Sequence, residues 1–437
     1  MGVQRSLLLD IKTPSKYVGY EKLTTSAVLK NIIADEKQIE EITTGNAELI
    51  FDQTPFYAEM GGQVADRGVI KDDQGTIVAE VTDVQHAPNG QNLHTVKVLA
   101  ALKVDDSYQL EVDQIFHNKV RKNHTATHLL DQALRDVLGS HTHQAGSLVE
   151  PDYLRFDFTN LGSVTVNDLK KVEEVVNEKI WQALPVKTVV TDIEAAKKMG
   201  AIALFTEKYG KVVRVVKVGN YSTEFCGGNH VDNTSELGLF KITSESGVGA
   251  GVRRIEAVTS KAAFEYLDHH DQLLQQTVQQ LKLTQLKELP HRLEQMNNEI
   301  RDLKQQVATL EGKLAQQQTA DIFQHPENVN GKTLVAAQVE VAGMQQLRAL
   351  ADQWKAKNSS DILVLATSPA ENKVNLIVAV SPTGVKAGIK AGDLIKQIAP
   401  LVGGGGGGRP DLAQAGGKKP AGIQAALAAA KKWLTER

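Results

Sequence analysis

Apolar and polar residues alternate with a period of two along the first part of the chain. Short alternating runs such as AELIF (47–51) and TIVAEVTDV (76–84) are separated by Gly, Asp and Asn residues that favour turns. Between them, the segment TPFYAEMGGQVADRG (54–68) is rich in small residues and predicts a loop. Residues 1–95 are therefore predicted to form mainly β-structure.

From about residue 113 the apolar spacing becomes that of a helix. The segment 113–139 has an apolar face and is predicted to end at Gly139; the face is formed by Ile115, Val120, Ala126, Leu130, Leu134 and Leu138. Strand and helix patterns then mix: strands over 154–159, 186–193 and 211–219, a helix over 168–184, a short helix begun by Ile193, and a further strand before 249–259. This mixture predicts an α+β domain over residues 96–262.

Residues 263–319 are dominated by Gln, Leu, Lys and Glu and predict long helices. A strict spacing of three and four residues relates Leu293, Met296, Ile300, Leu303, Val307, Leu310 and Leu314. This is the a/d pattern of a coiled coil. Because Pro290 interrupts the segment, two helices folded back as a hairpin are one prediction. A kinked helix that pairs with a second chain, as in a homodimer, is the other.

The last section, 320–437, predicts a compact α/β domain. Its elements follow in the order βαββα, with strands apolar enough to be buried on both faces. The composition of GGGGGGRPDLAQAGG (403–417) favours a flexible linker, with a phosphate cradle or a loop that approaches RNA as alternatives. Arg409 and the basic residues around it favour contacts with a nucleic-acid backbone.

Composition places the chain among soluble globular proteins. It has 437 residues, enough for two to four domains, with 41% hydrophobic and 23% charged residues. The longest apolar runs fall short of the ~18 residues of a membrane span, and the N-terminal run is too short for a signal peptide. A single cysteine, Cys226, excludes an internal disulfide and makes the cytoplasm the expected location.

Charge is distributed unevenly, although the net charge is only −3. From Ser381 onward, nine basic residues stand against three acidic ones, a local net charge of +6; the basic residues are Lys386, Lys390, Lys396, Arg409, Lys418, Lys419, Lys431, Lys432 and Arg437. Such an end is compatible with phosphate contacts. By itself it is more often an ordinary solvated surface.

Two short motifs predict one metal site. His124 and His128 are four residues apart in the predicted helix, so both imidazoles lie on the same face. In CGGNH (226–230), two glycines allow a tight turn through which Cys226 and His230 converge. Either motif alone is more easily explained by surface histidines or a buried cysteine. Together they form a tetrahedral set of ligands that zinc prefers, and we predict one Zn²⁺ per chain.

The role of this metal stays open at this point. Four protein ligands saturate a structural zinc, whereas a catalytic zinc needs an open position. His141 and His143 are possible substitute ligands. The segment LDHHD (267–271) is similar to metallophosphoesterase motifs, but no apolar strand precedes it. We therefore do not favour phosphoester hydrolysis.

The ordered motifs TPFYAEMGGQVADRG, NHTATHLL, CGGNHV, GVRRIEAVT and GGGGGGRPDLAQAGG resemble one family, the C-terminal part of bacterial alanyl-tRNA synthetase. The resemblance covers nearly the whole chain and also relates it to free-standing alanyl-tRNA editing proteins. It implies a β-barrel part of an editing domain (1–95), a zinc-binding editing core (96–262), a helical hairpin (263–319) and a C-Ala domain that binds tRNA (320–437).

The resemblance also implies roles for individual residues. The zinc ligands are expected to be His124, His128, Cys226 and His230, and the substrate-reading residues Thr127 and Gln144. The expected activity is hydrolysis of Ser-tRNA(Ala) and Gly-tRNA(Ala), with tRNA(Ala) as partner. The family usually has Thr where this chain has Asn229, which leaves the contacts around the ligands open.

No motif here resembles the ATP-dependent aminoacylation domain, so ligase activity is not expected of this chain alone. A fragment of a full synthetase and a free-standing editing protein both fit the motifs. The alternative function is a non-catalytic module that binds tRNA and oligomerises around a structural zinc.

Overall fold

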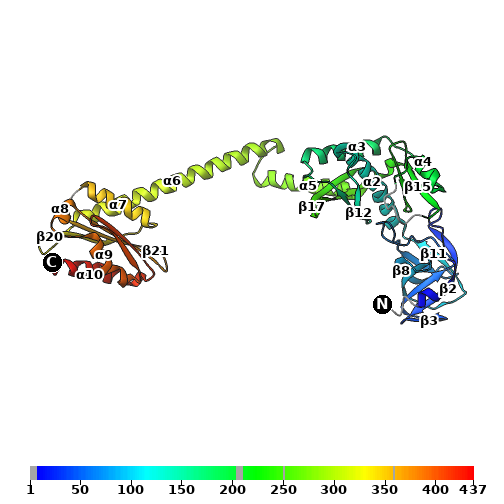
Figure 1. The fold of residues 1–437 in the computed structure, drawn as a ribbon, viewed down its shortest axis with the longest axis horizontal. Coiled ribbons are helices and arrows are strands. Elements are labelled where there is room, and N and C mark those ends of the chain that lie inside the picture. The colour runs from blue at the N-terminus through cyan, green and yellow to red at the C-terminus, as the bar shows by residue number, and fades with distance from the viewer. Residues whose placement is uncertain (1–6, 203–209, 250, 358–359) are drawn as a thin grey trace. The chain divides into compact units, whose positions relative to one another are not determined.

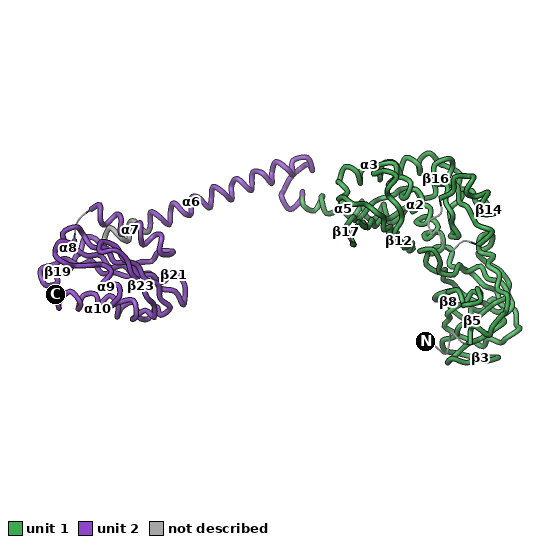
Figure 2. The backbone as a smooth tube through the Cα atoms, viewed as in Figure 1, with its two compact units in different colours: residues 1–277 green, residues 278–437 purple. Residues whose placement is uncertain are grey.

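The computed structural model describes residues 7–202, 210–249, 251–357 and 360–437. The chain forms two compact units, residues 1–277 and 278–437 (Figure 2), each with its own sheets and apolar cores. None of the helices within these described ranges is long and apolar enough to cross a membrane. The mixture of sheets and helices in Figure 1 confirms the predicted α+β class.

The unit formed by residues 1–277 begins with a closed β-barrel. Six strands follow one another around it, and the ring closes because β11 pairs with both β7 and β2. In order around the barrel they are β2 (Thr24–Ala34), β5 (Gly45–Phe51), β9 (Asn92–Val98), β8 (Ile77–His86), β7 (Gly68–Lys71) and β11 (Ser107–Val112). The period-two alternation puts one apolar row of each strand into the barrel core.

Five short strands accompany the barrel: β1 (Lys16–Tyr17), β3 (Lys37–Ile39), β4 (Glu41–Ile42), β6 (Gln53–Thr54) and β10 (Leu102–Lys103). The barrel and the expected strands at 47–51 and 76–84 confirm the period-two interpretation. The closing strand β11 lies beyond residue 95, where the sequence analysis ends the barrel. Its pairing with β2, whose partner residues lie 79–87 positions earlier, has no local signature.

Helix α2 (Gln114–Leu138) follows the barrel and confirms the helix predicted over 113–139. Its first turn is capped by Asp113, whose carboxylate accepts hydrogen bonds from the backbone N–H groups of Ile115 and Phe116. It ends at Gly139, whose φ of 115° lies in the left-handed region that glycine tolerates. Its apolar face packs on a four-stranded sheet, so the polar side of the helix is free for other contacts.

That sheet has the order β12 (Gln144–Val149), β13 (Leu154–Thr159), β18 (Val252–Thr259) and β17 (Phe240–Gly249). Helix α3 (Val166–Trp181) packs beside α2 over the same core. A separate three-stranded sheet contains β14 (Val186–Asp192), β15 (Val212–Val218) and β16 (Ser222–Phe225), with α4 (Ile193–Lys198) and the short η1 (Thr234–Leu237) nearby. Because β16 ends at Phe225, it positions the CGGNH segment that follows.

The helices predicted over 263–319 are present as α5 (Ser260–Gln280), the short η2 (Leu286–Glu288) and α6 (Leu289–Gln324). The break between α5 and α6 falls at residues 281–288, just before the predicted join at Leu289–Pro290, and Pro290 lies in the first turn of α6, where it is tolerated. Six a/d residues of α6 are 46–63% exposed: Leu293, Ile300, Leu303, Val307, Leu310 and Leu314. Their pairing in a coiled coil stays a prediction.

The C-terminal domain is built on one six-stranded sheet. Its order is β19 (Glu327–Val329), β20 (Lys332–Gln338), β21 (Ile362–Ala370), β22 (Lys373–Val380), β24 (Leu412–Gly417) and β23 (Gly405–Arg409). Its helices are α7 (Met344–Lys357), α8 (Pro382–Lys386), α9 (Ala391–Ile398) and α10 (Ile423–Thr435), with η3 (Ala399–Val402) and η4 (Pro420–Gly422). Strands β21 and β22 are buried on both faces, as predicted.

The glycine run corrects one prediction. Composition favoured a flexible linker, but residues 405–409 form strand β23, paired antiparallel with β24. A side chain on Gly406 or Gly408 would collide with the backbone of β24, so the close pairing requires glycine there. A sequence pattern that counts only composition misses this requirement, because the steric partner lies on another strand.

Candidate metal centre

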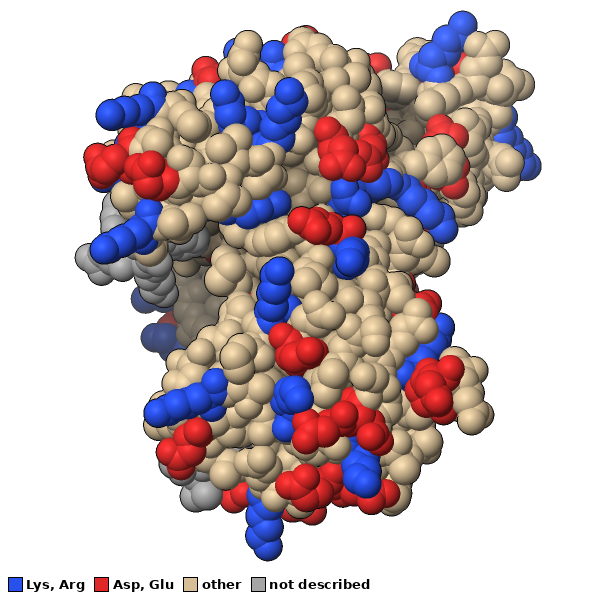
Figure 3. All heavy atoms as spheres, turned by 90° about the vertical axis from the view of Figure 1, so that its right-hand side faces the viewer, with Lys and Arg blue, Asp and Glu red and all other residues tan. Residues whose placement is uncertain are grey.

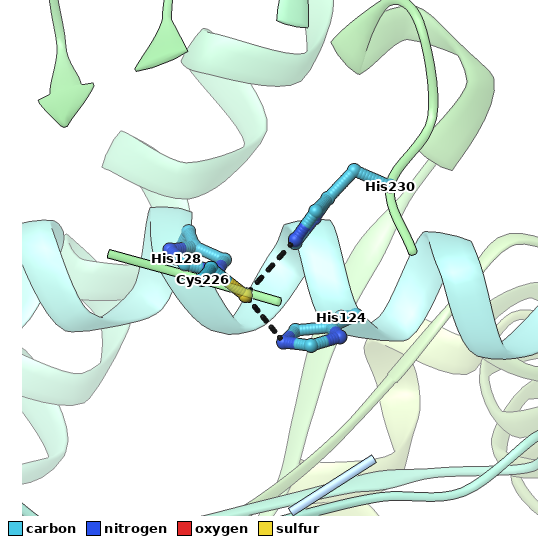
Figure 4. A group of neighbouring side chains, drawn as sticks. All are labelled: His124, His128, Cys226 and His230. Atoms are coloured by element: carbon cyan, nitrogen blue, oxygen red, sulfur yellow. Dashed lines mark hydrogen bonds between the residues drawn. The ribbon is translucent and has the colours of Figure 1, made fainter. Parts of the chain in front are cut away.

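Four side chains converge in the first unit, and they are the four that the sequence predicts. His124 and His128 project from α2, while Cys226 and His230 come from the loop after β16 (Figure 4). One ligand atom of each lies within 4.8 Å of the others. The Cys226 Sγ is 3.4 Å from His124 Nε2 and 3.3 Å from His230 Nε2.

These separations fit a tetrahedral zinc site. Zinc–nitrogen and zinc–sulfur bonds of ~2.0 and ~2.3 Å place neighbouring ligands roughly 3.5 Å apart. The three imidazoles are buried and the cysteine is half-buried, so the donors are largely shielded from bulk water. Within the described residues no other group of His, Cys, Asp and Glu side chains converges in this way. His141, His143 and the exposed LDHHD segment on α5 therefore stay outside it.

Each imidazole contacts a protein oxygen through its Nδ1 atom. His124 Nδ1 lies 2.7 Å from Oε1 of Gln63, and His230 Nδ1 lies 3.1 Å from Oγ1 of Thr125. His128 Nδ1 is 2.6 Å from a carboxylate oxygen of Glu224. Such outer contacts fix the tautomer and orientation of metal-binding histidines, and they direct the other nitrogen to the metal.

The electrostatics of the cluster favour a thiolate. Burial opposes the charged form of Cys226, but the neighbouring imidazoles outweigh it and hold the pKa of the thiol well below its usual value. Burial lowers the pKa of His230 to about 3, so this imidazole is neutral. Burial also acts against the charged form of His128, yet Glu224 and Cys226 raise its pKa well above the usual value. Thiolate and neutral imidazole are the metal-binding forms, so a metal must displace the His128 proton.

The loop that carries Cys226 is held from the barrel side by two tyrosines. The hydroxyl of Tyr17 donates to Oδ1 of Asn229 over 3.1 Å, and that of Tyr20 donates to the Gly227 carbonyl over 2.5 Å. Tyr17 and Tyr20 meet edge to face with ring centroids 4.8 Å apart. Asn229 stands where the family usually has Thr, and its side chain contacts Tyr17 on the barrel side.

Arg214 of β15 holds the same loop from its own sheet. Its guanidinium donates to the carbonyl oxygens of Cys226 and Gly228, over 3.1 and 2.6 Å, and lies 4.1 Å above the ring of Tyr20. Gly228 has no room for a side chain, because a Cβ there would collide with the ring of His124. The glycines of CGGNH thus allow the tight turn of the loop, and Gly228 also lets the loop pack closely against His124.

The two predicted substrate-reading residues lie in different settings. Thr127 is buried in α2, one residue before His128, and its hydroxyl donates to the Asn123 carbonyl over 2.9 Å. Gln144 is the first residue of β12 and is half-buried. Sequence reasoning missed Gln63, Glu224, Tyr17 and Arg214. Only Gln63 had a signal, since it lies in the conspicuous segment 54–68.

Comparisons with known proteins agree with this arrangement. Three family models match: "Threonyl and Alanyl tRNA synthetase second additional domain" over residues 213–256, "DHHA1 domain" over 331–436, and "tRNA synthetases class II (A)" over 1–116. The first match includes Cys226 and His230. The third differs from the expectation from the sequence, in which no motif resembles the synthetase core and residues 1–95 belong to the editing part.

Several curated relatives are alanine–tRNA ligases. Alanine–tRNA ligase of Ligilactobacillus salivarius is 66% identical over the entire chain, and those of Lactiplantibacillus plantarum and Enterococcus faecalis are 64% and 57% identical. The chain spans about half the length of these curated relatives. The solved C-Ala domain of Aquifex aeolicus alanyl-tRNA synthetase is 32% identical, covers 25% of this chain and 98% of its own, and has a TM-score of 0.24.

The matched domains and the convergent donor set place the chain among proteins related to aminoacyl-tRNA synthetases. More particularly, it resembles the C-terminal part of alanyl-tRNA synthetases, and it matches the models of the second additional and DHHA1 domains.

Proposed function

We propose that this chain is an aminoacyl-tRNA deacylase that hydrolyses Ser-tRNA(Ala) and Gly-tRNA(Ala) with one zinc ion per chain. The observation that carries the proposal is the convergence of His124, His128, Cys226 and His230 in a unit related to the second additional domain. A pocket that accepts alanine cannot strongly reject glycine or serine, because one small group gives only about 10–200-fold discrimination. A separate hydrolytic site supplies the missing accuracy.

The residues around the donors suit ester hydrolysis. A zinc ion held by these side chains would supply Lewis-acid polarisation and lower the pKa of water once one of the four donors gives way or the ion accepts a fifth ligand. Thr127 lies on the same helix as two of the ligands. Because its hydroxyl already donates to Asn123, it offers lone pairs that accept a hydrogen bond from the hydroxyl of a seryl group. We assign this reading role to Thr127 and a substrate-positioning role to Gln144.

The proposal extends to partners and location. We propose that the C-terminal domain, related to DHHA1, contacts tRNA(Ala) phosphates through Arg409 and the basic residues around it. On the face drawn in Figure 3, basic and acidic side chains are interspersed, so that face offers no comparable single-sign surface. The exposed apolar row on α6 fits a second copy of the chain, and we propose a homodimer and a cytoplasmic location.

One observation favours a second function. Four protein donors fill a tetrahedral zinc, so the metal would be structural and the chain a tRNA-binding and oligomerisation module. Rates of Ser-tRNA(Ala) deacylation, measured for the wild type and for Cys226→Ala, distinguish the deacylase from the non-catalytic module. We expect rapid hydrolysis by the wild type and its loss in the variant, with tRNA binding retained. Binding without hydrolysis by the wild type would establish the second function.

A further inference from the structure

Gln63 is a fully buried side chain that touches both halves of the metal centre. It comes from the barrel side, in the loop between β6 and β7, and is 0% exposed. Its Oε1 lies 2.7 Å from Nδ1 of His124 on α2 and accepts the backbone N–H of Asn229 over 2.9 Å. One oxygen atom thus joins the helix that carries two donors to the loop that carries the other two.

The backbone around Gln63 is itself held in place. The Gly62 carbonyl accepts the N–H of Val149, over 2.7 Å, and the N–H of Val64 donates to the Val149 carbonyl over 3.2 Å. Gly62 has a φ of +90°, and a Cβ on it would meet the backbone of Ser147. Strand β12 therefore anchors the segment on both sides of Gln63, and the side chain has little freedom to move.

The contact determines which ring nitrogen of His124 carries a proton. Nε2 of His124 faces the Cys226 Sγ, so a proton on Nδ1 is what leaves Nε2 free to bind a metal. Oε1 of Gln63 accepts that Nδ1–H. The other end of the amide, Nε2 of Gln63, is buried and has no hydrogen-bond partner in the structure. The accepting oxygen is therefore the part of the side chain that acts on the centre.

We propose that Gln63 is a positioning residue of the metal centre. It fixes the tautomer and ring orientation of His124 and holds the CGGNH loop against α2, so that the barrel determines how tightly the metal is bound. The inference rests on the metal of the proposed function but not on its hydrolytic activity. It gives the segment 54–68, which the sequence singles out, a physical role.

The test compares zinc affinities, measured by competition with a chromophoric chelator. Gln63→Leu keeps much of the volume and removes the acceptor, and we expect its zinc affinity to fall by about 10–100-fold. Gln63→Glu keeps an accepting oxygen and replaces the amide nitrogen by a second carboxylate oxygen, whose negative charge favours a bound cation, so its affinity should equal or exceed that of the wild type. Gln91→Leu is the matched control: Gln91 is another buried barrel glutamine, whose side chain donates to the Ile11 carbonyl. Its zinc affinity should be unchanged.

Two results would overturn the inference: Gln63→Leu binding zinc as tightly as wild type, or the Leu and Glu variants losing affinity equally. Circular dichroism of each zinc-free variant shows whether it folds. If Gln63→Leu does not fold, Gln63→Asn, which withdraws the oxygen by one methylene, takes its place with the same expectation. A wild type that binds zinc but leaves Ser-tRNA(Ala) intact would end the deacylase proposal and leave the role of Gln63 standing.

Discussion

Nε2 of His124 and Sγ of Cys226 lie 3.4 Å apart although 102 residues separate them in the chain. A metal bound between them joins α2 to the loop after β16. Since the ligands form a site only in the folded protein, binding free energy contributes to folding free energy. Removal of the metal should therefore act on the first unit and leave the second unchanged.

We predict that a strong chelator destabilises residues 114–230 selectively. A ligand present at about 1,000 times its Kd stabilises the folded state by about 4 kcal/mol, and chelation removes this contribution. Hydrogen exchange measured by mass spectrometry should show faster exchange in peptides of α2 and β16. Peptides of β21 and β22 in the C-terminal domain are the internal control. Equal acceleration in both units would contradict a metal confined to His124, His128, Cys226 and His230.

Thr127→Val should separate serine from glycine as substrates. The variant keeps the shape of the side chain but loses the hydroxyl that we propose reads the seryl group. Loss of a neutral hydrogen bond costs about 0.5–1.5 kcal/mol. Hydrolysis of Ser-tRNA(Ala) should therefore slow by roughly 2–13-fold, while that of Gly-tRNA(Ala), which has no hydroxyl to read, changes little. Single-turnover rates with both substrates test this, and equal slowing of the two would refute the reading role.

Leu303→Glu and Leu310→Glu on α6 should weaken self-association. Both residues belong to the a/d row, and their side chains are 51% and 63% exposed in the single chain. Pairing of two helices would bury a carboxylate at either position, and its desolvation would oppose the pairing. Sedimentation velocity over a range of concentrations should show a shift from dimer to monomer. Gln306→Glu, an exposed position on the same helix, is the control. A wild type that is monomeric throughout would remove the dimer from the proposal.

Acid should destabilise the barrel through His94. This fully buried imidazole lies 2.7 Å from the Thr54 hydroxyl and 3.0 Å from the Leu49 carbonyl, and burial lowers its pKa to about 4. Between the usual pKa of 6.5 and about 4, the unfolded chain binds a proton that the folded one does not. Stability therefore falls as pH decreases through this window, by up to about 3 kcal/mol at 1.36 kcal/mol per pKa unit.

Urea unfolding of wild type and His94→Gln at several pH values checks this prediction. The variant should be less stable at pH 7, because two buried contacts are perturbed, but its stability should depend less steeply on pH between 6.5 and 4. Parallel pH profiles for the two proteins would show that another group causes the acid sensitivity.

Sequence reasoning reached the elements whose signals are local. The helix over 113–139 follows from its apolar spacing and its stop at Gly139, and the strands at 47–51 and 76–84 follow from alternation. It also reached the four donors, because HxxxH and CxxxH each bring two of them together within a few residues. The glycine run was misread, since its partner β24 is reached only after the chain turns back.

By itself the sequence determined the residue chemistry, the helical and strand periods and a break between two helices near Pro290, because these depend on a residue and its near neighbours. Only the tertiary structure decided that the two half-motifs meet and that Gln63 arrives from the barrel to join them. It also decided that Glu224 faces His128 and that Tyr17 reaches Asn229. The residues that form these contacts are far apart in the chain. The separation ranges from 61 residues, for Gln63 and His124, to 212 residues, for Tyr17 and Asn229. Their geometry comes from closure of the barrel and packing of α2 on its sheet, which no local pattern encodes.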